Sequence, residues 1–490
     1  MNDMNWLAIY PEILLLAMGC VVALVDLWVT DEQRRPTYWL TQLTLAIVAG
    51  LHFSYFDAGL TTYAMQGMVV ADPMGHLLAG FACIATLVTL VYARPYAGVR
   101  EMLKGELFIL SLFALLGINV MLSANNFLVV YLGLELMSLS LYALVALRRD
   151  NAIATEAAMK YFVLGALASG FLLYGLSMMY GATGSLSIPQ VFDVISQGVP
   201  NASVLVFGVV FVVAGLAFKL GAAPFHMWVP DVYQGAPTAI TLFIGSVPKI
   251  AAFGFAYRLL DAGLAPTAEQ WGQMLAWLAL LSLVIGNLIA LAQTNLKRML
   301  AYSTISHMGF VLLGMLSGVV ANKADGAVNA YSSSMFYSIT YMLTTLGTFG
   351  LILVRTRKGF EAETLDDLKG MSRRHPWFAF LMLVMMFSMA GIPPTVGFYA
   401  KLSVLQAVVS AGMSWLAVVA VVFSLIGAFY YLRIVKLMYF DAPVGEEPLE
   451  ASTGLRSVLS LNGLAVILLG LFPAGLMDLC FQAIRATLAS

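Results

Sequence analysis

Four ionisable side chains lie inside long apolar stretches of the sequence: Glu135, Lys219, Lys249 and Lys401. A charge at membrane depth costs about 2.5–3.5 kcal/mol on insertion scales, so each of these residues needs a functional or structural reason. Burial allows a lysine to release its proton near neutral pH, whereas arginine stays charged. Because the arginines fall in loops or near the ends of apolar runs, the pattern favours proton transfer. For Glu135, a structural salt bridge is the alternative.

His307 is a further candidate for moving protons. It lies inside an apolar run, one helical turn after Ser303, and imidazole gains and loses a proton near neutral pH. A core histidine that is hydrogen-bonded to serine is the alternative. His226 follows a Gly/Pro-rich segment and is predicted either in a hydrated cavity or in a loop. The hydroxyl-rich run 331–348 is not assigned to a water path, because serine and threonine also hold membrane helices together.

Two further lysines are weaker candidates. Glu156 and Lys160 are spaced i, i+4, which is typical of a surface ion pair with a snorkelling lysine. Lys297 and Arg298 begin an apolar run, and their default interpretation is anchoring at the membrane interface. The sequence contains no phosphate-binding loop, nucleophile elbow or haem-ligand pair, so we expect substrate chemistry to take place in other chains.

The composition places these residues in a membrane protein. The chain has 490 residues, of which 61% are apolar and 10% charged, whereas soluble domains have about 45–50% and about 25%. The apolar runs are long and unbroken, which predicts an all-α polytopic membrane protein rather than a transmembrane barrel. The net charge of -1 provides no basic field for nucleic acid. The three cysteines lack the spacing of metal ligands or disulfides, so we expect no bound metal or cofactor.

The apolar runs predict about fourteen transmembrane helices. Their predicted ranges are 7–29, 37–56, 75–93, 105–123, 126–147, 154–180, 203–222, 237–259, 271–292, 297–319, 327–354, 376–408, 413–439 and 454–475. No basic residue precedes the first run, so we expect it to stay as a membrane helix rather than to be removed as a targeting peptide.

Two of these spans are interrupted by glycine and proline, at 221–224 and at 391–394. Proline removes a backbone donor and breaks a helix, and broken helices are tolerated at membrane depth where they line a hydrated cavity. The breaks are five spans apart, which predicts two five-helix repeats of opposite orientation, at 105–260 and 261–440. Helices 1–3 (1–104) precede them and a last helix (441–490) follows. Independent proline kinks are the alternative.

Basic residues alternate between the predicted loops. The odd-numbered loops hold Arg34, Arg35, Arg94, Arg100, Lys104, Arg148, Arg149, Lys297, Arg298, Arg355, Arg357, Lys358, Lys369, Arg373 and Arg374, and the even-numbered loops hold Arg258 and Lys323. Because basic loops stay on the cytoplasmic side, both termini are predicted on the outer side and loop 355–375 on the inner side.

Several motifs resemble a known family. They are FKLGAAPFHMWVPDVYQGAPT at 218–238, NLKRMLAYSTISHMG at 295–309, EAAMKYF at 156–162 and AGIPP at 390–394. These motifs identify the chain as similar to the antiporter-like subunits of proton-pumping NADH:quinone oxidoreductase, respiratory complex I. The resemblance covers about residues 120–440. Within this family, the chain resembles the subunit N branch. Lys401 distinguishes it from subunit M, which carries glutamate at the corresponding position, and the short C-terminal region distinguishes it from subunit L. Gln234 departs from the glutamate of many relatives.

The resemblance implies roles for residues and partners. It makes Glu135 and Lys219 a pair in the first half, Lys249 the link between halves, and Lys401 the terminal lysine of the second half. It implies that NADH, FMN, iron–sulfur clusters and quinone are handled by partner subunits. Subunit M and the small membrane subunits would be neighbours in the lipid bilayer of a bacterial inner membrane, across which protons move.

Three functions remain open from the sequence. The first is a proton-translocating subunit of complex I. The second is a subunit of a multi-subunit cation/proton antiporter, which shares the broken-helix signature. The third is a structural membrane module with no proton path. The number and depth of the lysines favour the first over the third, and the details of the sixth and twelfth spans favour it over the second.

Overall fold

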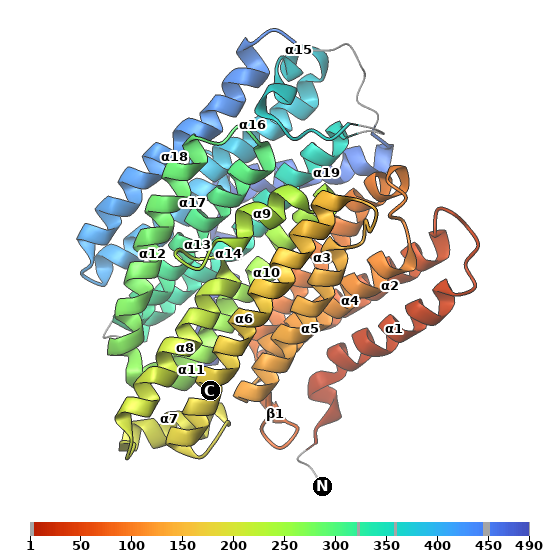
Figure 1. Cartoon of the computed structure of the whole chain (residues 1–490). Coiled ribbons are helices and arrows are strands. Elements are labelled where there is room, and N and C mark those ends of the chain that lie inside the picture. The colour runs from red at the N-terminus through yellow and green to blue at the C-terminus, as the bar shows by residue number, and fades with distance from the viewer. Residues whose placement is uncertain (1–3, 321–323, 357–359, 444–450, 490) are drawn as a thin grey trace.

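The apolar runs form long helices that pack side by side, as the computed structural model shows (Figure 1). The structure describes residues 4–320, 324–356, 360–443 and 451–489. Within them, twelve helical stretches are long and apolar enough to cross a membrane, one of which, 238–291, joins two helices. In lipid every backbone polar group must be satisfied within the protein, which is why these runs fold as helices. The chain is an all-α polytopic membrane protein, as predicted.

The first half of the chain contains the three N-terminal helices and the first interrupted span. Its elements are η1 (Trp6–Ile9), α1 (Tyr10–Asp26), α2 (Arg35–Ala58), β1 (Thr62–Ala64), β2 (Val69–Ala71), α3 (Pro73–Val99), α4 (Gly105–Leu122), α5 (Phe127–Val145), α6 (Ala152–Thr183), α7 (Ile188–Gln197), α8 (Ala202–Leu220), α9 (Trp228–Gly235), α10 (Thr238–Ala256) and the π-helical turn η2 (Tyr257–Asp261). The strands β1 and β2 form an antiparallel hairpin.

The second half contains the other interrupted span. Its elements are α11 (Ala262–Leu264), η3 (Ala265–Thr267), α12 (Ala268–Leu291), α13 (Leu296–Val320), α14 (Ala324–Arg355), η4 (Leu365–Leu368), α15 (Met371–Arg374), α16 (Pro376–Ala390), α17 (Val396–Ser410), α18 (Ser414–Phe440), α19 (Thr453–Leu471) and α20 (Ala474–Leu488). Most predicted spans coincide with one of these helices. The span predicted at 376–408 is divided at its break into α16 and α17, whereas the span predicted at 203–222 coincides with α8 and ends at the first break. The number of spans and the inverted repeats stay predictions.

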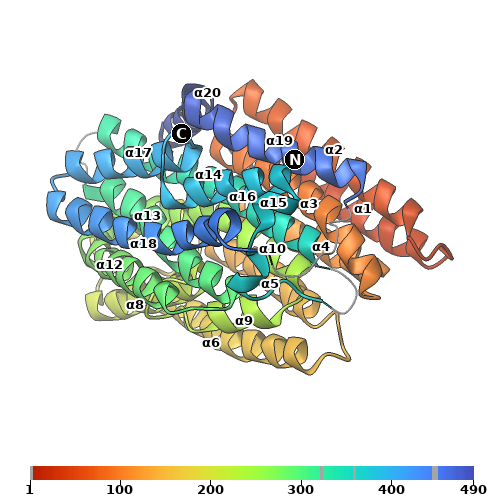
Figure 2. The same ribbon diagram turned by 90° about the horizontal axis from the view of Figure 1, so that it is seen from above.

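Three differences from the predicted elements concern the ends of spans. The hairpin β1–β2 and the amphipathic helix α7 were not predicted, because each is too short to stand out as an apolar run. The last predicted span, 454–475, ran past the end of α19 at Leu471, and the second helix α20, which follows after Phe472 and Pro473, was not predicted. Both α19 and α20 pack against α14 (Figure 2). Proline ends α19 because it cannot continue the helical hydrogen bonds.

The loops gather at two opposite ends of the bundle. At one end, which includes α15, the loop after α14 meets other basic loops through the ion pair Arg100–Glu361 and the bridge Asn295–Thr364 (Figure 1). At the other end, the bridges Val69–Ala124 and Asn126–Ser187 join the even-numbered loops. The C-terminal part lies at this second end as well, since the Met74 amide donates to the Thr487 hydroxyl at 3.4 Å. The grouping of odd-numbered and even-numbered loops follows the predicted alternation; which end faces the cytoplasm stays a prediction.

Arg258 was wrongly predicted as a loop residue. It lies in the π-helical turn η2 with only 4% of its surface exposed. Its Nη2 donates to both carboxylate oxygens of Asp72 at 2.7 Å, which compensates for the burial of its charge. Three other basic residues of the predicted loops, Lys323, Arg357 and Lys358, lie outside the described residues.

The predicted orientation can be measured with cysteine labelling. We expect Arg373→Cys, at an exposed position of α15, to react with a membrane-impermeant maleimide only from the cytoplasmic side. Ser196→Cys, at an exposed position of α7 at the opposite end, should react only from the outer side. The wild-type chain with its three native cysteines gives the background. Labelling of Arg373→Cys from outside intact cells would contradict the predicted topology.

Candidate functional site

At the first break, a buried lysine from another helix binds the end of the interrupted helix. Helix α8 ends at Leu220, and Gly221 follows with φ +75°, a left-handed conformation that glycine adopts without steric cost. Lys249 of α10 is 2% exposed, and its Nζ donates to the Leu220 carbonyl at 3.0 Å. The last carbonyls of a helix lack intrahelical donors and carry partial negative charge. The ammonium of Lys249 therefore stabilises the free end of α8.

The second break has the same arrangement. Helix α16 ends at Ala390, and Gly391 follows with φ +81°. Lys401 of α17 donates through Nζ to the carbonyls of Met389 and Ala390, each at 3.0 Å, and to the Ser424 hydroxyl at 2.8 Å. An ammonium has three N–H groups, so all three are matched by an oxygen. The geometric counterpart of Lys401 in the first half is thus Lys249.

Glu135 lies on the polar stripe of α5, and Lys219 of α8 contacts that stripe. The described residues show no direct ion pair between Glu135 and Lys219. Lys219 Nζ donates to Ser138 Oγ at 3.1 Å and is 3.4 Å from the Tyr142 hydroxyl. The carboxylate of Glu135 accepts a hydrogen bond from Ser169 of α6. The hydroxyl groups of Ser138 and Tyr142 on α5 thus lie next to Lys219, while the action of Glu135 and Lys219 as a pair and the alternative of a structural salt bridge for Glu135 both stay predictions. The stripe itself was predicted by the helical spacing of Glu135, Ser138 and Tyr142.

His307 bridges two tyrosines in the interior. Its Nδ1 lies 2.6 Å from the Tyr337 hydroxyl and its Nε2 lies 3.0 Å from the Tyr431 hydroxyl. A neutral imidazole has one nitrogen that donates and one that accepts, so one of the two tyrosine hydroxyls accepts a hydrogen bond from His307 and the other donates one to it. Ser303 contacts Tyr431 rather than His307. The predicted alternative of a histidine satisfied by Ser303 is therefore wrong in its partner.

His307 and Lys401 line the same narrow cavity. It has room for about one water molecule. The other lining residues are Tyr337, Thr340, Tyr341, Thr344, Ser388, Met389, Gly397 and Ala400. The four lining residues from α14 belong to the hydroxyl-rich run 331–348, which was not assigned to a water path from the sequence, and their spacing places them on one helical face. The second half therefore brings together a lysine, a histidine and several hydroxyl groups around one polar space.

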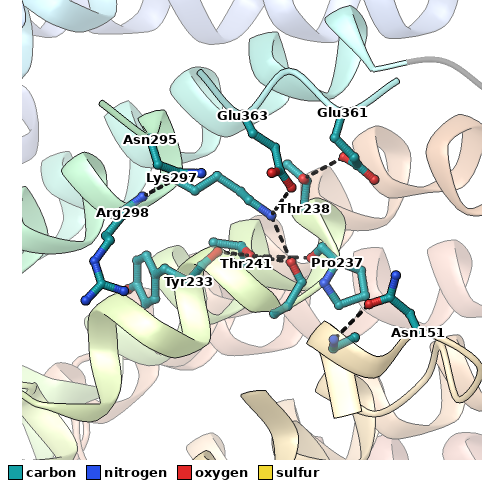
Figure 3. A network of polar contacts seen from close by, with 12 residues as sticks. Asn151, Tyr233, Pro237, Thr238, Thr241, Asn295, Lys297, Arg298, Glu361 and Glu363 are labelled. Carbon is teal, nitrogen blue, oxygen red and sulfur yellow. Dashed lines mark hydrogen bonds and ion pairs between the residues drawn. The ribbon is translucent and has the colours of Figure 1, made fainter. Parts of the chain in front are cut away.

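Lys297 was wrongly interpreted as an interface anchor. It is 2% exposed, and its Nζ donates to the Ala236 carbonyl at 3.1 Å and lies 3.8 Å from Glu363 Oε1. Figure 3 shows its side chain extending from α13 toward the start of α10, where Thr238 donates to Glu361. The buried ammonium is thus part of a network that links α13 and α10 to the loop after α14. This network could not be predicted from side-chain spacing, because its acceptors are backbone atoms and loop residues.

Comparison with known proteins identifies the family. The family model described as NADH:quinone oxidoreductase/Mrp antiporter, TM, matches residues 124–427. NADH-quinone oxidoreductase subunit N of Cupriavidus taiwanensis is 65% identical over 491 residues, which cover 100% of each chain. The chain belongs to the subunit N family of NADH-quinone oxidoreductase. The subunit N of Herminiimonas arsenicoxydans is 60% identical, again over 100% of each chain.

Solved structures place this subunit N family member in the same fold as two kinds of complex. A chain of respiratory complex I from Thermus thermophilus with bound aureothin is 31% identical, with a TM-score of 0.81, over 96% of this chain and 98% of that one. A chain of the Mrp complex from Dietzia sp. DQ12-45-1b is 20% identical, with a TM-score of 0.82, over 99% and 97%. The second likeness shows the fold alone.

Lys160 and His226 lie at the edge of this arrangement. Lys160 forms the predicted surface ion pair with Glu156 at 2.9 Å and a second one with Asp231 at 3.0 Å. His226 is half-buried in the segment between α8 and α9, and its Nδ1 has no hydrogen-bond partner among the described residues. It does not line the cavity of His307 and Lys401. Gln234 accepts a hydrogen bond from Arg298 at 3.1 Å.

Proposed function

We propose that this chain translocates protons across a bacterial inner membrane as a membrane-arm subunit of NADH:quinone oxidoreductase. Electron transfer from NADH through FMN and iron–sulfur clusters to quinone would take place in partner subunits. Its membrane neighbours would be subunit M and the small membrane subunits, with both of its termini on the outer side. The observation that supports the proposal best is the pair of buried lysines, Lys249 and Lys401, at the free ends of two broken helices.

The protonation state of each lysine is linked to the hydrogen bonds at the end of a helix. Protonated Lys401 gives one N–H to each of three oxygens. After it releases a proton, the neutral amine keeps two N–H groups, so one oxygen must find another donor, such as water in the adjacent cavity. Broken helices are where water is tolerated at membrane depth. Proton release would therefore change the hydration and the geometry of the break together.

The proposed order of groups follows the half-repeats. Glu135, which accepts from Ser169, precedes Ser138 and Tyr142 on the polar stripe of α5, and the hydroxyls of these two residues contact Lys219. Lys249 binds the carbonyl of the residue that follows Lys219, which brings the second lysine next to the first. His307 and Lys401 share the cavity of the second half. Lys160 and Lys297 are assigned supporting roles, since their ammonium groups bind Asp231 and the Ala236 carbonyl rather than the groups of this route. His226 is also assigned a supporting role, since it does not line the cavity of the second half.

A lysine-to-methionine variant tests the proposal. In the assembled complex, Lys249→Met should lower proton uptake per NADH oxidised several-fold, because methionine fills the space but carries no proton. The measurement uses everted membrane vesicles, with NADH oxidation and proton uptake recorded together. Lys436→Met is the matched control, since this lysine side chain is 62% exposed at the end of α18.

The same measurement separates the two alternatives. A structural scaffold predicts wild-type proton uptake in the assembled Lys249→Met complex. A cation/proton antiporter predicts that proton movement depends on the concentration of sodium or potassium rather than on NADH oxidation. Either result would overturn the proposal.

A further inference from the structure

A buried chain of hydrogen bonds lies outside the lysines described above. The Nδ1 atoms of His52 in α2 and His76 in α3 are 3.1 Å apart, and Asn119 Nδ2 of α4 is 3.1 Å from His52 Nε2. The exposed fractions of these three side chains are 0%, 5% and 1%. None of the residues assigned to proton translocation belongs to this series of hydrogen bonds. Two histidines that face each other in the interior are a titratable site that the proposed route does not use.

The geometry lets the two histidines share one proton. Where two ring nitrogens meet at hydrogen-bond distance, one must donate and the other accept. If the Asn119 amide donates to Nε2 of His52, then Nδ1 of His52 carries the shared proton and donates to His76. If the amide is turned, its oxygen accepts from Nε2 of His52 and the shared proton belongs to His76. The two arrangements therefore differ in whether Nε2 of His52 and Nε2 of His76 carry a proton.

Charged and titratable groups surround the histidines on every neighbouring element. Asp72, at the start of α3, receives Arg258 from η2 at 2.7 Å, and both lie next to His76. The Tyr55 ring of α2 packs edge-on against His76, with 5.2 Å between ring centroids. Cys83 of α3 is close to Asn119. On α1, the Glu12 side chain is 8% exposed and acts electrostatically on Tyr55.

Two of these groups have free hydrogen-bonding capacity. Glu12 Oε2 and Asn119 Oδ1 are buried, and neither has a hydrogen-bond partner within the described part of the chain. A buried oxygen without a donor is costly, so an unfilled acceptor beside a titratable pair indicates a site where a proton or a water molecule is bound at times. The Tyr55 hydroxyl donates to the Leu7 carbonyl at 2.9 Å and leads from His76 to the end of the bundle that holds β1 and β2.

We propose that His52, His76 and Asn119 form a proton-exchange site that opens toward the predicted outer side of the membrane. One proton enters at Nε2 of His52 once the Asn119 amide has turned. The proton on Nδ1 of His52 crosses to Nδ1 of His76, and the proton on Nε2 of His76 leaves past Tyr55. Each step moves one proton, and the pair ends with the same number of protons as at the start. The assignment of this site to proton release rests on the proposed function.

The test compares the response to pH on the two sides of the membrane. Everted vesicles that contain the assembled complex are loaded with buffers between about pH 5 and 8, the range in which histidine titrates. NADH-driven proton uptake is then measured at constant external pH. In wild type we expect uptake to change with the pH of the lumen, which corresponds to the outer side. In His76→Asn this dependence should be lost, because asparagine can accept from Nδ1 of His52 but cannot carry a proton.

His52→Asn is the second variant, and His375→Asn is the matched control. His375 precedes α16 at the opposite end of the bundle, so its variant should keep the wild-type response. A wild-type dependence on lumen pH in both His52→Asn and His76→Asn would overturn the proposal. Failure of both variants to assemble would also count against it and would assign the pair a structural role. Wild-type pumping in Lys249→Met would instead contradict the proposed function, which keeps the two failures distinct.

Discussion

Replacement of Lys401 by arginine is expected to leave the complex assembled but to lower its coupled turnover by roughly 10²-fold, the scale on which a positioned proton-transfer group contributes. Lys401 matches its three N–H groups to three oxygens at the break after α16. Arginine keeps the positive charge at this position, but guanidinium does not lose its proton in proteins. The variant therefore separates a fixed charge from a group that must exchange a proton.

The measurement is NADH-driven quinone reduction together with proton uptake in membrane vesicles, normalised to assembled complex. Lys369→Arg is the control, because Lys369 lies in the loop before α15 and pairs with Asp366 at 2.9 Å. That substitution should leave both rates near wild type. Near-normal rates in both variants would make Lys401 a fixed charge. His307, which lines the same cavity, would then be the next candidate for the relay.

The sequence predicted the helices well because lipid imposes a strong and simple requirement. A span needs a long apolar run, and all of the predicted runs became helices within a few residues of their expected ends. The missed elements do not meet this requirement. Helix α7 is short and amphipathic, β1 and β2 have three residues each, and α20 is separated from α19 by a proline. Their positions depend on packing against other helices, which a single apolar window does not report.

The candidate site was predicted in its residues but not in its connections. Glu135, Lys219, Lys249 and Lys401 were found because charge inside an apolar run is rare. That Lys249 and Lys401 bind equivalent helix ends could not be predicted, because their acceptors are backbone carbonyls on other helices. The same holds for the buried Lys297 network. Side-chain spacing along one helix predicts a shared face, but it does not tell which atoms of another helix lie opposite.

Removal of the carboxylate at Glu135 is expected to lower proton pumping per NADH by roughly tenfold or more in the assembled complex. An opposite charge favours the ionised form of its partner, and we expect the carboxylate of Glu135 to act on the ammonium of Lys219 in this way. In Glu135→Ala that influence disappears, and Ser169 loses its acceptor. The charged form of Lys219 then becomes more costly, which should impair its cycle of proton uptake and release.

A second substitution separates charge from hydrogen bonding at this position. Glu135→Gln keeps an oxygen that can accept from Ser169 but removes the negative charge. If charge is what matters, Glu135→Gln should pump as poorly as Glu135→Ala. Glu156→Ala is the control, because this glutamate side chain is 66% exposed on α6 and pairs with Lys160. Wild-type proton-to-electron ratios in assembled Glu135→Ala would reduce Glu135 to a structural residue. Recovery in Glu135→Gln alone would show that the contact with Ser169, rather than the interaction with Lys219, is what the first half requires.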